Sequence, residues 1–270
     1  MISFPQCKIN IGLNIHYKRD DNYHEISTVM YPVPINDVLE VVKSDQFEFT
    51  SSGLDIPGAI NDNLCVKAFN IIRDKYAIPN VHAHLYKSIP MGGGLGGGSS
   101  DATEMLKLLN SEFELSITNK ELKEFASQLG SDCPFFVENK PQVAFGRGEE
   151  LKTIGLDLSG YYLLLINDGT HVSTKDAYSN VNPRNPEYNI EESVKLPIEK
   201  WKDVIHNQFE ESVFGSYQHL KLLKESIYSL GAIYASMTGS GATMYGLFEE
   251  KPDIDPKRFG DINFLKIIQL

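Results

Sequence analysis

Hydrophobic and polar residues alternate strictly in several segments of the first half of the chain. In residues 8–15 every second side chain is apolar, which is the period of a half-buried strand. The polar residues 18–22 predict the turn that ends this strand. The same reasoning predicts further strands at 26–31, 38–49 and 81–86.

Other segments carry apolar residues three or four positions apart, which is the spacing of a helix. Asp62 is expected to cap the first such helix, whose apolar stripe lies within 64–72. The stripe of the second helix lies within 102–109. The third begins with a capping box of Thr118 and Glu121, in which each residue bonds a backbone N–H that the helix leaves unpaired.

The second half of the chain repeats this mixture of elements. A buried strand is predicted at 161–166, and helices are predicted at 198–214 and 218–230. The polar segment 182–197 holds three prolines and is expected to form an exposed loop. Two strands are expected around a glycine-rich turn at 238–242. The alternation indicates an α+β protein with two layered domains.

Composition and charge narrow the class of protein. A chain of 270 residues with 41% hydrophobic and 23% charged residues has enough interior for a sizeable core. No apolar run approaches the roughly 20 residues of a membrane helix, and the N-terminus lacks the pattern of a secretion signal. The formal net charge of −11 argues against a nucleic-acid or anionic-membrane surface.

The cysteines and histidines give no sign of a disulfide framework or a metal centre. Cys7, Cys65 and Cys133 are odd in number and far apart, so a reducing cytoplasm is the simplest interpretation. None of the seven histidines has the spacing of zinc ligands.

The most informative segment is a loop with six glycines in seven positions, from Gly92 to Gly98. Glycine lets the backbone approach a polyanion closely with several N–H groups, and the helix after the loop adds its positive end. A flexible linker is the alternative, but a strand precedes this loop and a helix follows it. The loop lacks the Gly-Lys-Ser/Thr ending of a P-loop. It does contain the G-x-G-x-x-G spacing of a dinucleotide-binding fingerprint, but a run this rich in glycine contains that spacing almost unavoidably, so the match carries little weight.

Several motifs together resemble the GHMP kinase superfamily. Within it, the chain most resembles the kinases that act on a cytidine-diphosphate-linked methylerythritol. The motifs that carry the resemblance span most of the chain in the expected order: Lys8–Asn10, Tyr23–His24, Lys87 with Pro90–Ser100, Gly130–Phe135, Val172–Thr174 with Ala177–Tyr178, and Thr238–Ala242.

The resemblance implies an α+β fold of two domains. Residues 1–155 would form an α/β domain similar to ribosomal protein S5 domain 2, and residues 156–270 a ferredoxin-like domain, with the site between them. The implied reaction is ATP- and Mg²⁺-dependent phosphorylation of the 2-hydroxyl of 4-(cytidine 5′-diphospho)-2-C-methyl-D-erythritol. The implied partner is therefore a small molecule, without nucleic acid or membrane.

Three alternatives remain open at this point. A GHMP kinase for another small alcohol, such as homoserine or mevalonate, would have no base to stack. A nucleotide-binding module without turnover would not need a general base and its lysine. A Rossmann-type dinucleotide domain would begin with a βαβ unit, which the N-terminal pattern lacks.

Phosphoryl transfer mainly requires that the γ-phosphate be held in line with a hydroxyl and its charge neutralised. By resemblance, Asp132 is expected to be the general base and Lys8 its partner, whose ammonium favours the ionised carboxylate. By residue type alone, Asp132 before Pro134 is also typical of a helix start, and Lys8 of a solvent-facing strand position. Asn10 shares the face of Lys8 and by resemblance binds substrate.

The glycine loop and two flanking residues are expected to bind ATP. Ser99 or Ser100 could also ligate Mg²⁺ with its hydroxyl, or serve only as a helix cap. By residue type alone, Asn63 could be a residue of the first helical turn and Lys87 a surface lysine. The full set is Pro90, Met91, Gly92, Gly93, Gly94, Leu95, Gly96, Gly97, Gly98, Ser99, Ser100, Asn63 and Lys87.

A cytidine ring requires an aromatic platform and partners for its polar edge. Tyr23 and Tyr178 are expected to stack on the base, and His24 to contact its edge. By residue type alone, Tyr23 and His24 could simply belong to a hairpin. The full set of expected substrate residues is Asn10, Tyr23, His24, Asp132, Thr174, Tyr178 and Gly239.

Three positions depart from the pattern of these kinases. Gln208 stands where a carboxylate is common, which puts a metal or substrate role there in doubt. Asn22 replaces a glycine before Tyr23, a tolerable change because asparagine accepts the left-handed conformation. Cys7 replaces an alanine, and its thiol is expected to make the site sensitive to thiol reagents.

Overall fold

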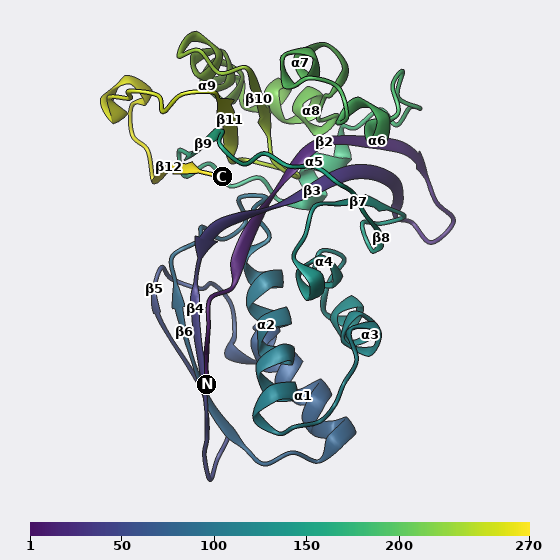
Figure 1. The fold of residues 1–270 in the computed structure, drawn as a ribbon, viewed down its shortest axis with the longest axis vertical. Helices are drawn as coiled ribbons and strands as arrows, with labels where there is room; N and C mark the ends of the chain where they lie inside the picture. Colours follow the sequence, from purple (N-terminus) through teal and green to yellow (C-terminus); the bar gives the residue numbers. More distant parts are fainter. The chain divides into compact units, whose positions relative to one another are not determined.

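The computed structural model describes all 270 residues, which divide into two compact units (Figure 1). Unit 1 comprises Met1–Lys8, Pro32–Met91 and Gly96–Lys140, and unit 2 comprises the remainder. The chain therefore passes between the units several times, and the glycine loop contributes residues to both. The division expected at residue 155 concerns the domains of the kinase superfamily and stays a prediction.

Unit 1 is built on a four-stranded sheet in which β5 pairs parallel to β6 and the other neighbours pair antiparallel. The strand predicted at 81–86 is confirmed as β6. The single strand predicted at 38–49 is wrong, because the chain turns after Lys43 and begins a second strand at Glu48. The order across the sheet is β1 (Ile2–Ser3), β4 (Val38–Lys43), β6 (Val81–Lys87) and β5 (Glu48–Gly53).

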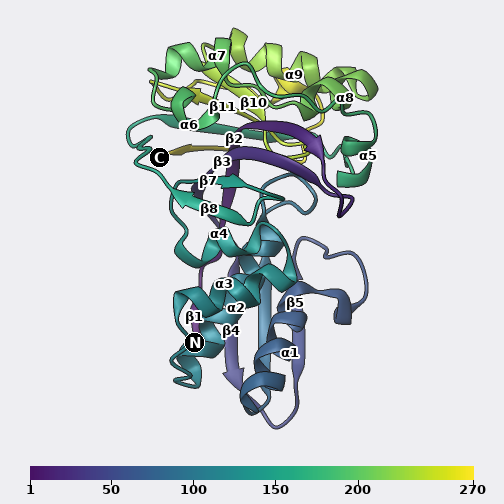
Figure 2. The ribbon, with the colours of Figure 1, turned by 90° about the vertical axis from the view of Figure 1, so that its right-hand side faces the viewer.

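The helices of unit 1 lie on one face of this sheet, and no helix lies on the other (Figures 1 and 2). The apolar positions of β4 and β6 pack there against the stripes of α1 and α2. The capping box of α3 is confirmed, but the residue that caps α1 is Asn63, not Asp62. The helices are η1 (Ile60–Asp62), α1 (Leu64–Tyr76), α2 (Gly97–Glu112), α3 (Asn119–Leu129) and α4 (Cys133–Glu138).

One sheet of unit 2 has the strand order of a ferredoxin-like domain, as expected, with all neighbours antiparallel. α8 (Phe209–Ser216) and α9 (Gln218–Ser229) cover one of its faces (Figure 2). Only the short η3 (Pro256–Phe259) stands where the second helix of such a domain belongs. The order is β10 (Tyr234–Met237), β11 (Met244–Phe248), β9 (Tyr162–Asn167) and β12 (Phe264–Gln269).

A third sheet contains the long N-terminal hairpin, whose two strands contribute residues to both units. The strands predicted at 8–15 and 26–31 are confirmed within β2 and β3. Asn22 in their turn has φ +66°, in the left-handed region that asparagine tolerates. The order is β2 (Gln6–Lys18), β3 (His24–Asn36), β7 (Gln142–Phe145) and β8 (Glu150–Thr153).

The segment from 174 to 216 is more broken than its pattern predicts. The expected loop at 182–197 contains a short helix, and the helix expected at 198–214 is interrupted at Ile205, where Asn207 forms a bridge with Leu13 of β2. The elements are α5 (Thr174–Ser179), α6 (Ile190–Ser193), η2 (Ile198–Lys200), α7 (Trp201–Val204) and α8. No helix anywhere in the chain has the length and apolarity to span a bilayer.

Candidate active site

The glycine loop reaches from the end of β6 to the first turn of α2. Gly92, Gly94 and Gly96 have φ between +67° and +76°, a region that glycine adopts without steric cost. Leu95 between them is buried and anchors the loop. α2 begins at Gly97, so both serines lie within its first turn, and neither caps the helix because the capping position is Gly96.

Thr238 fixes the loop at Gly94. Its hydroxyl donates to the carbonyl oxygen of Gly94 at 3.0 Å and accepts from the backbone N–H of Asn10 at 2.9 Å. A Cβ on Gly94 would lie 2.0 Å from the carbonyl oxygen of Thr238. The sequence motif at 238–242 indicated a glycine-rich turn but not that its threonine, Thr238, holds the glycine loop.

Replacing Gly94 by alanine is expected to lower the free energy of unfolding by more than roughly 1–2 kcal/mol, the cost of a left-handed alanine alone, because its Cβ also meets the Thr238 backbone. The matched control is Gly98→Ala, since a Cβ on Gly98 has nothing within 4 Å. Urea unfolding of both variants tests this. Equal stability of the two would contradict the close approach of the loop to Thr238.

Lys8 and Asp132 form an ion pair in unit 1, with Lys8 Nζ 3.3 Å from Asp132 Oδ2. The lysine side chain is 3% exposed, so Lys8 is not the solvent-facing residue that its strand position alone suggested. Asp132 occupies the capping position of α4, yet its side chain makes no capping hydrogen bond there. The Asp132 side chain is 34% exposed. The carboxylate is thus accessible and beside an ammonium, as a general base for a bound alcohol requires.

Both cysteines near this ion pair are buried, which argues against the expected reactivity of Cys7. Cys7 is fully buried, and burial raises its pKa to about 12. Burial likewise raises the pKa of Cys133, next to Asp132, to about 12. Because the thiolate is the reactive form, both cysteines are expected to react slowly with thiol reagents.

Lys87, at the end of β6, is the centre of a buried network with Asp37, which lies between β3 and β4, and Asp101 of α2. Its Nζ donates to Asp37 and, at 2.6 Å, to Oδ2 of Asp101. Oδ1 of Asp37 also accepts from the backbone N–H of Ser88 and Ile89. Lys87 is therefore not a surface lysine, and its contact with a nucleotide stays a prediction.

Burial and neighbouring charges in this network shift the pKa values of Lys87 and Asp101. Burial alone would lower the pKa of Lys87, but the two carboxylates beside it raise it above its usual value. Burial raises the pKa of Asp101 from 3.8 to about 7, although Lys87 opposes the shift. Oδ1 of Asp101 is buried without a hydrogen-bond partner, which is costly unless a ligand or water supplies a donor.

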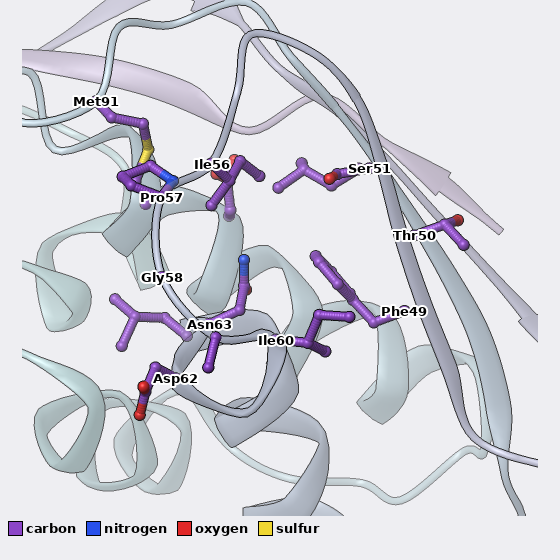
Figure 3. Close-up of a pocket in the computed structure, with 15 residues that line it drawn as sticks. Phe49, Thr50, Ser51, Ile56, Pro57, Gly58, Ile60, Asp62, Asn63 and Met91 are labelled. Carbon is purple, nitrogen blue, oxygen red and sulfur yellow. The ribbon is translucent and has the colours of Figure 1, made fainter.

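A pocket of about 400 Å³ opens beside the first turn of α2 in unit 1 (Figure 3). Its volume is in the range of small-molecule sites. Asn63 belongs to its wall, although its side-chain oxygen is occupied in capping α1 through Cys65 N–H. Two more predicted residues, Met91 and Gly98, also line it, as does Asp101. The remaining lining residues are Phe49, Thr50, Ser51, Ile56, Pro57, Gly58, Ala59, Ile60, Asp62, Leu64 and Leu85.

An aromatic cluster in unit 2 brings together two of the predicted cytidine residues. The rings of His24 and Tyr178 stack at 4.7 Å with an interplanar angle of 13°, and Phe209 meets Tyr178 edge-on. Desolvation lowers the pKa of His24, which favours its neutral form. Tyr23 is not part of this stack: it is 55% exposed, with the guanidinium of Arg147 4.9 Å from its ring centroid.

Other predicted substrate residues lie around the 238–242 turn. The Asn10 side chain donates to Thr28, and its backbone donates to Thr238. The hydroxyl of Thr174, at the start of α5, is 3.4 Å from that of Ser240.

Sequence reasoning missed Asn207, whose side chain holds the same turn. Its amide donates to the carbonyl oxygens of Met237 and Gly239, both at 2.8 Å. The neighbouring Gln208 accepts from the backbone of Ile15, so it joins β2 to α8. No group of three or more His, Cys, Asp or Glu side chains is placed to hold a metal ion.

Comparison with protein families gives two matches. The GHMP kinases N terminal domain matches residues 63–140, and the GHMP kinases C terminal domain matches residues 191–257. The first match contains the glycine loop and Asp132, and the second contains Asn207 and the 238–242 turn.

Curated relatives match nearly the whole chain. One from Bacteroides fragilis is 44% identical over 263 residues, 96% of each chain, and one from Parabacteroides distasonis is 46% identical over 250 residues, 93% of this chain and 92% of the relative. Both are 4-diphosphocytidyl-2-C-methyl-D-erythritol kinases.

Solved structures show the same fold. A crystal structure of 4-(cytidine 5′-diphospho)-2C-methyl-D-erythritol kinase matches with a TM-score of 0.80 and 29% identity, covering 92% of this chain and 90% of that one. The mevalonate kinase of Methanococcus jannaschii, at 12% identity and a TM-score of 0.70 over 99% of this chain and 96% of that one, shares the fold alone. The chain belongs to the GHMP kinases and, within them, to the family of 4-diphosphocytidyl-2-C-methyl-D-erythritol kinases.

Proposed function

We propose that this kinase transfers the γ-phosphoryl group of ATP to the 2-hydroxyl of 4-(cytidine 5′-diphospho)-2-C-methyl-D-erythritol. The observation that carries the proposal is the pair of Lys8 and Asp132, 3.3 Å apart. The Asp132 carboxylate is accessible and unused in capping, and Lys8 supplies a buried positive charge beside it. A nucleotide-binding module without turnover has no need of this pair.

In the proposed reaction Asp132 takes the proton from the 2-hydroxyl as the oxygen bonds to the γ-phosphorus, and the bond to the β-phosphate oxygen breaks to release ADP. The Lys8 ammonium lowers the cost of the negative charge that develops on the attacking oxygen. Bound Mg²⁺ would offset charge on the phosphates. Of the two serines, Ser99 fits a magnesium ligand better, since Ser100 is only 1% exposed.

The nucleotide is proposed to bind with its phosphates on the glycine loop and its adenosine in the pocket of unit 1. Gly98 supports this placement, because it lines that pocket and has open space where a Cβ would stand. The unpartnered Oδ1 of Asp101 at the same wall is an acceptor for a ligand donor. Gly98→Ala is expected to leave the stability of the protein unchanged. It is expected to weaken ATP binding, because the added Cβ would enter the space proposed for the nucleotide.

The cytidine is proposed to bind at the cluster of His24 and Tyr178. Tyr178→Ala is expected to raise the KM for the cytidylyl substrate roughly ten- to hundredfold, in line with one to three kcal/mol per stacked base. The KM for ATP should stay near the wild-type value, and Tyr178→Phe should keep both constants because it retains the ring. Steady-state kinetics with each substrate varied measures this, and equal changes in both KM values would remove the stacking assignment.

The reaction is tested by coupled release of ADP with the cytidylyl substrate, run beside mevalonate and homoserine. Turnover on the cytidylyl substrate alone is expected. Turnover on mevalonate or homoserine alone would replace the proposed substrate by another small alcohol, and no turnover on any of the three would overturn the kinase reaction.

A cytoplasmic location belongs to the proposal, since all three cysteines are free thiols.

A further inference from the structure

The outer face of the unit 1 sheet, opposite α1 and α2, carries two histidines on one strand. His82 and His84 occupy alternate positions of β6 and therefore project from the same face. Both are half-buried. Neighbouring side chains of this face are open to solvent, with Val42 42% and Tyr86 49% exposed. The proposed phosphoryl transfer makes no use of these histidines.

The two imidazoles converge on one atom. His82 Nε2 lies 3.0 Å and His84 Nδ1 2.8 Å from the hydroxyl oxygen of Thr50, on the adjacent strand β5. The other nitrogen of His84, Nε2, lies 2.9 Å from the hydroxyl of Ser52. When His84 Nε2 donates its proton to Ser52, His84 Nδ1 directs its lone pair toward the Thr50 hydroxyl, which His82 also contacts. Such a hydrogen bond to the far nitrogen is what orients histidine ligands in metal sites.

We propose that His82 Nε2 and His84 Nδ1 form a two-ligand site for a divalent transition-metal ion, of the class of Zn²⁺ and Cu²⁺. Imidazole nitrogen suits these ions. Zinc–nitrogen bonds are about 2.1 Å long, shorter than the present distances to Thr50, so small ring rotations that displace the hydroxyl bring both nitrogens into bonding range. Because no third His, Cys, Asp or Glu joins them in a cluster, water completes the coordination and the ion exchanges freely.

The charges around the pair favour a cation. In register across the sheet, His84 stands beside Glu40 of β4 and Thr50 of β5, and His82 stands beside Val42 and Glu48. Neither histidine has a lysine or arginine as a cross-strand neighbour. Two carboxylates on the flanking strands therefore lower the cost of bringing a divalent ion to this face.

The two histidines are not among the residues that line the nucleotide pocket. Thr50, whose hydroxyl contacts both histidines, does line it, together with its strand neighbours Phe49 and Ser51. The proposed ligands, His82 and His84, have no part in the proposed kinase reaction, so the proposal does not depend on it. Its failure would leave that reaction untouched.

The test is calorimetric titration of the nucleotide-free, magnesium-free protein with Zn²⁺. Wild type is expected to bind with an affinity that falls at least tenfold in His82→Gln and in His84→Gln. Thr50→Val is expected to bind at least as well as wild type, since it removes only the competing hydroxyl. The control is His219→Gln, a histidine of unit 2 bonded to Thr170, which should match wild type.

Electron paramagnetic resonance of one equivalent of Cu²⁺ on wild type gives a second measurement, in which coupling to two nitrogens is expected. Thermal unfolding of each variant without metal shows whether it is folded. Affinities of His82→Gln and His84→Gln within twofold of wild type would overturn the proposal. Loss of binding in His219→Gln, or copper coupled to fewer than two nitrogens, would overturn it as well.

Discussion

Asp132→Ala is expected to lower kcat about 10²- to 10⁴-fold, the range of general-base catalysis, while the Kd for ATP changes little. The physical reason is that the carboxylate, beside Lys8 at 3.3 Å, acts on the acceptor hydroxyl rather than on the nucleotide. The measurements are kcat from coupled ADP release and Kd from nucleotide titration of the same sample. The matched control is Asp74→Ala, an exposed aspartate of α1 whose only ion pair is with Arg73.

The result separates two roles of Asp132. A loss confined to kcat identifies an interaction made in the transition state. If ATP affinity falls by the same factor as kcat, Asp132 serves the nucleotide and not the acceptor. Asp132→Asn, which keeps the shape of the side chain but cannot take a proton, should be as inactive as the alanine variant.

Lys87→Met is expected to lower the free energy of unfolding by roughly 3–5 kcal/mol, the cost of leaving a buried charge without its partner. Asp37 and Asp101 are 0% and 2% exposed, and Lys87 is the cation that both of them contact. For a chain of this size the melting temperature should fall by about 10 °C. Thermal and urea unfolding measure it, with Lys67→Met, on the exposed surface of α1, as the control. A change below 1 kcal/mol would show that the three charges are not mutually dependent.

The same network makes stability depend on pH in a defined direction. The pKa of Asp101 is raised from 3.8 to about 7 in the folded state, so between these values the folded protein holds a proton that the unfolded chain has released. Its contribution to stability is therefore present below pH 4 and is lost as pH rises through 7. Asp101→Asn stays neutral and should remove this part of the pH dependence. Urea unfolding at pH 5 and pH 8 compares the two proteins, and parallel profiles would contradict the shift.

Local patterns predicted the elements well where sequence neighbours determine them. Strand β6, helix α2 and the capping box of α3 each depend on residues within a few positions of one another. Lys87 shows a signal that was available but overlooked: it continues the alternate positions of Val81, Ala83 and Leu85, all buried, and so belongs to the inner face of β6.

The partners of the site residues could not be predicted, because they come from distant parts of the chain. Lys87 meets Asp37, 50 residues away. The Asn10 backbone meets Thr238, 228 residues away. Nothing in the sequence around Tyr178 indicates that His24 stacks on it, since packing decides which aromatic rings meet. The break in the helix expected at 198–214 has a similar cause, because the backbone of Gln208 bonds to Leu13 of β2.

The two hydrogen bonds of the Thr238 hydroxyl have a consequence for the affinities of the two substrates. The same oxygen holds the backbone of the glycine loop at Gly94 and the backbone of β2 at Asn10. Any shift of the loop when phosphates bind therefore changes the position of a residue expected to contact the acceptor. By linkage, the factor by which one substrate alters the affinity of the other must be equal in both directions. The two substrates of this kinase are thus expected to bind in an interdependent manner.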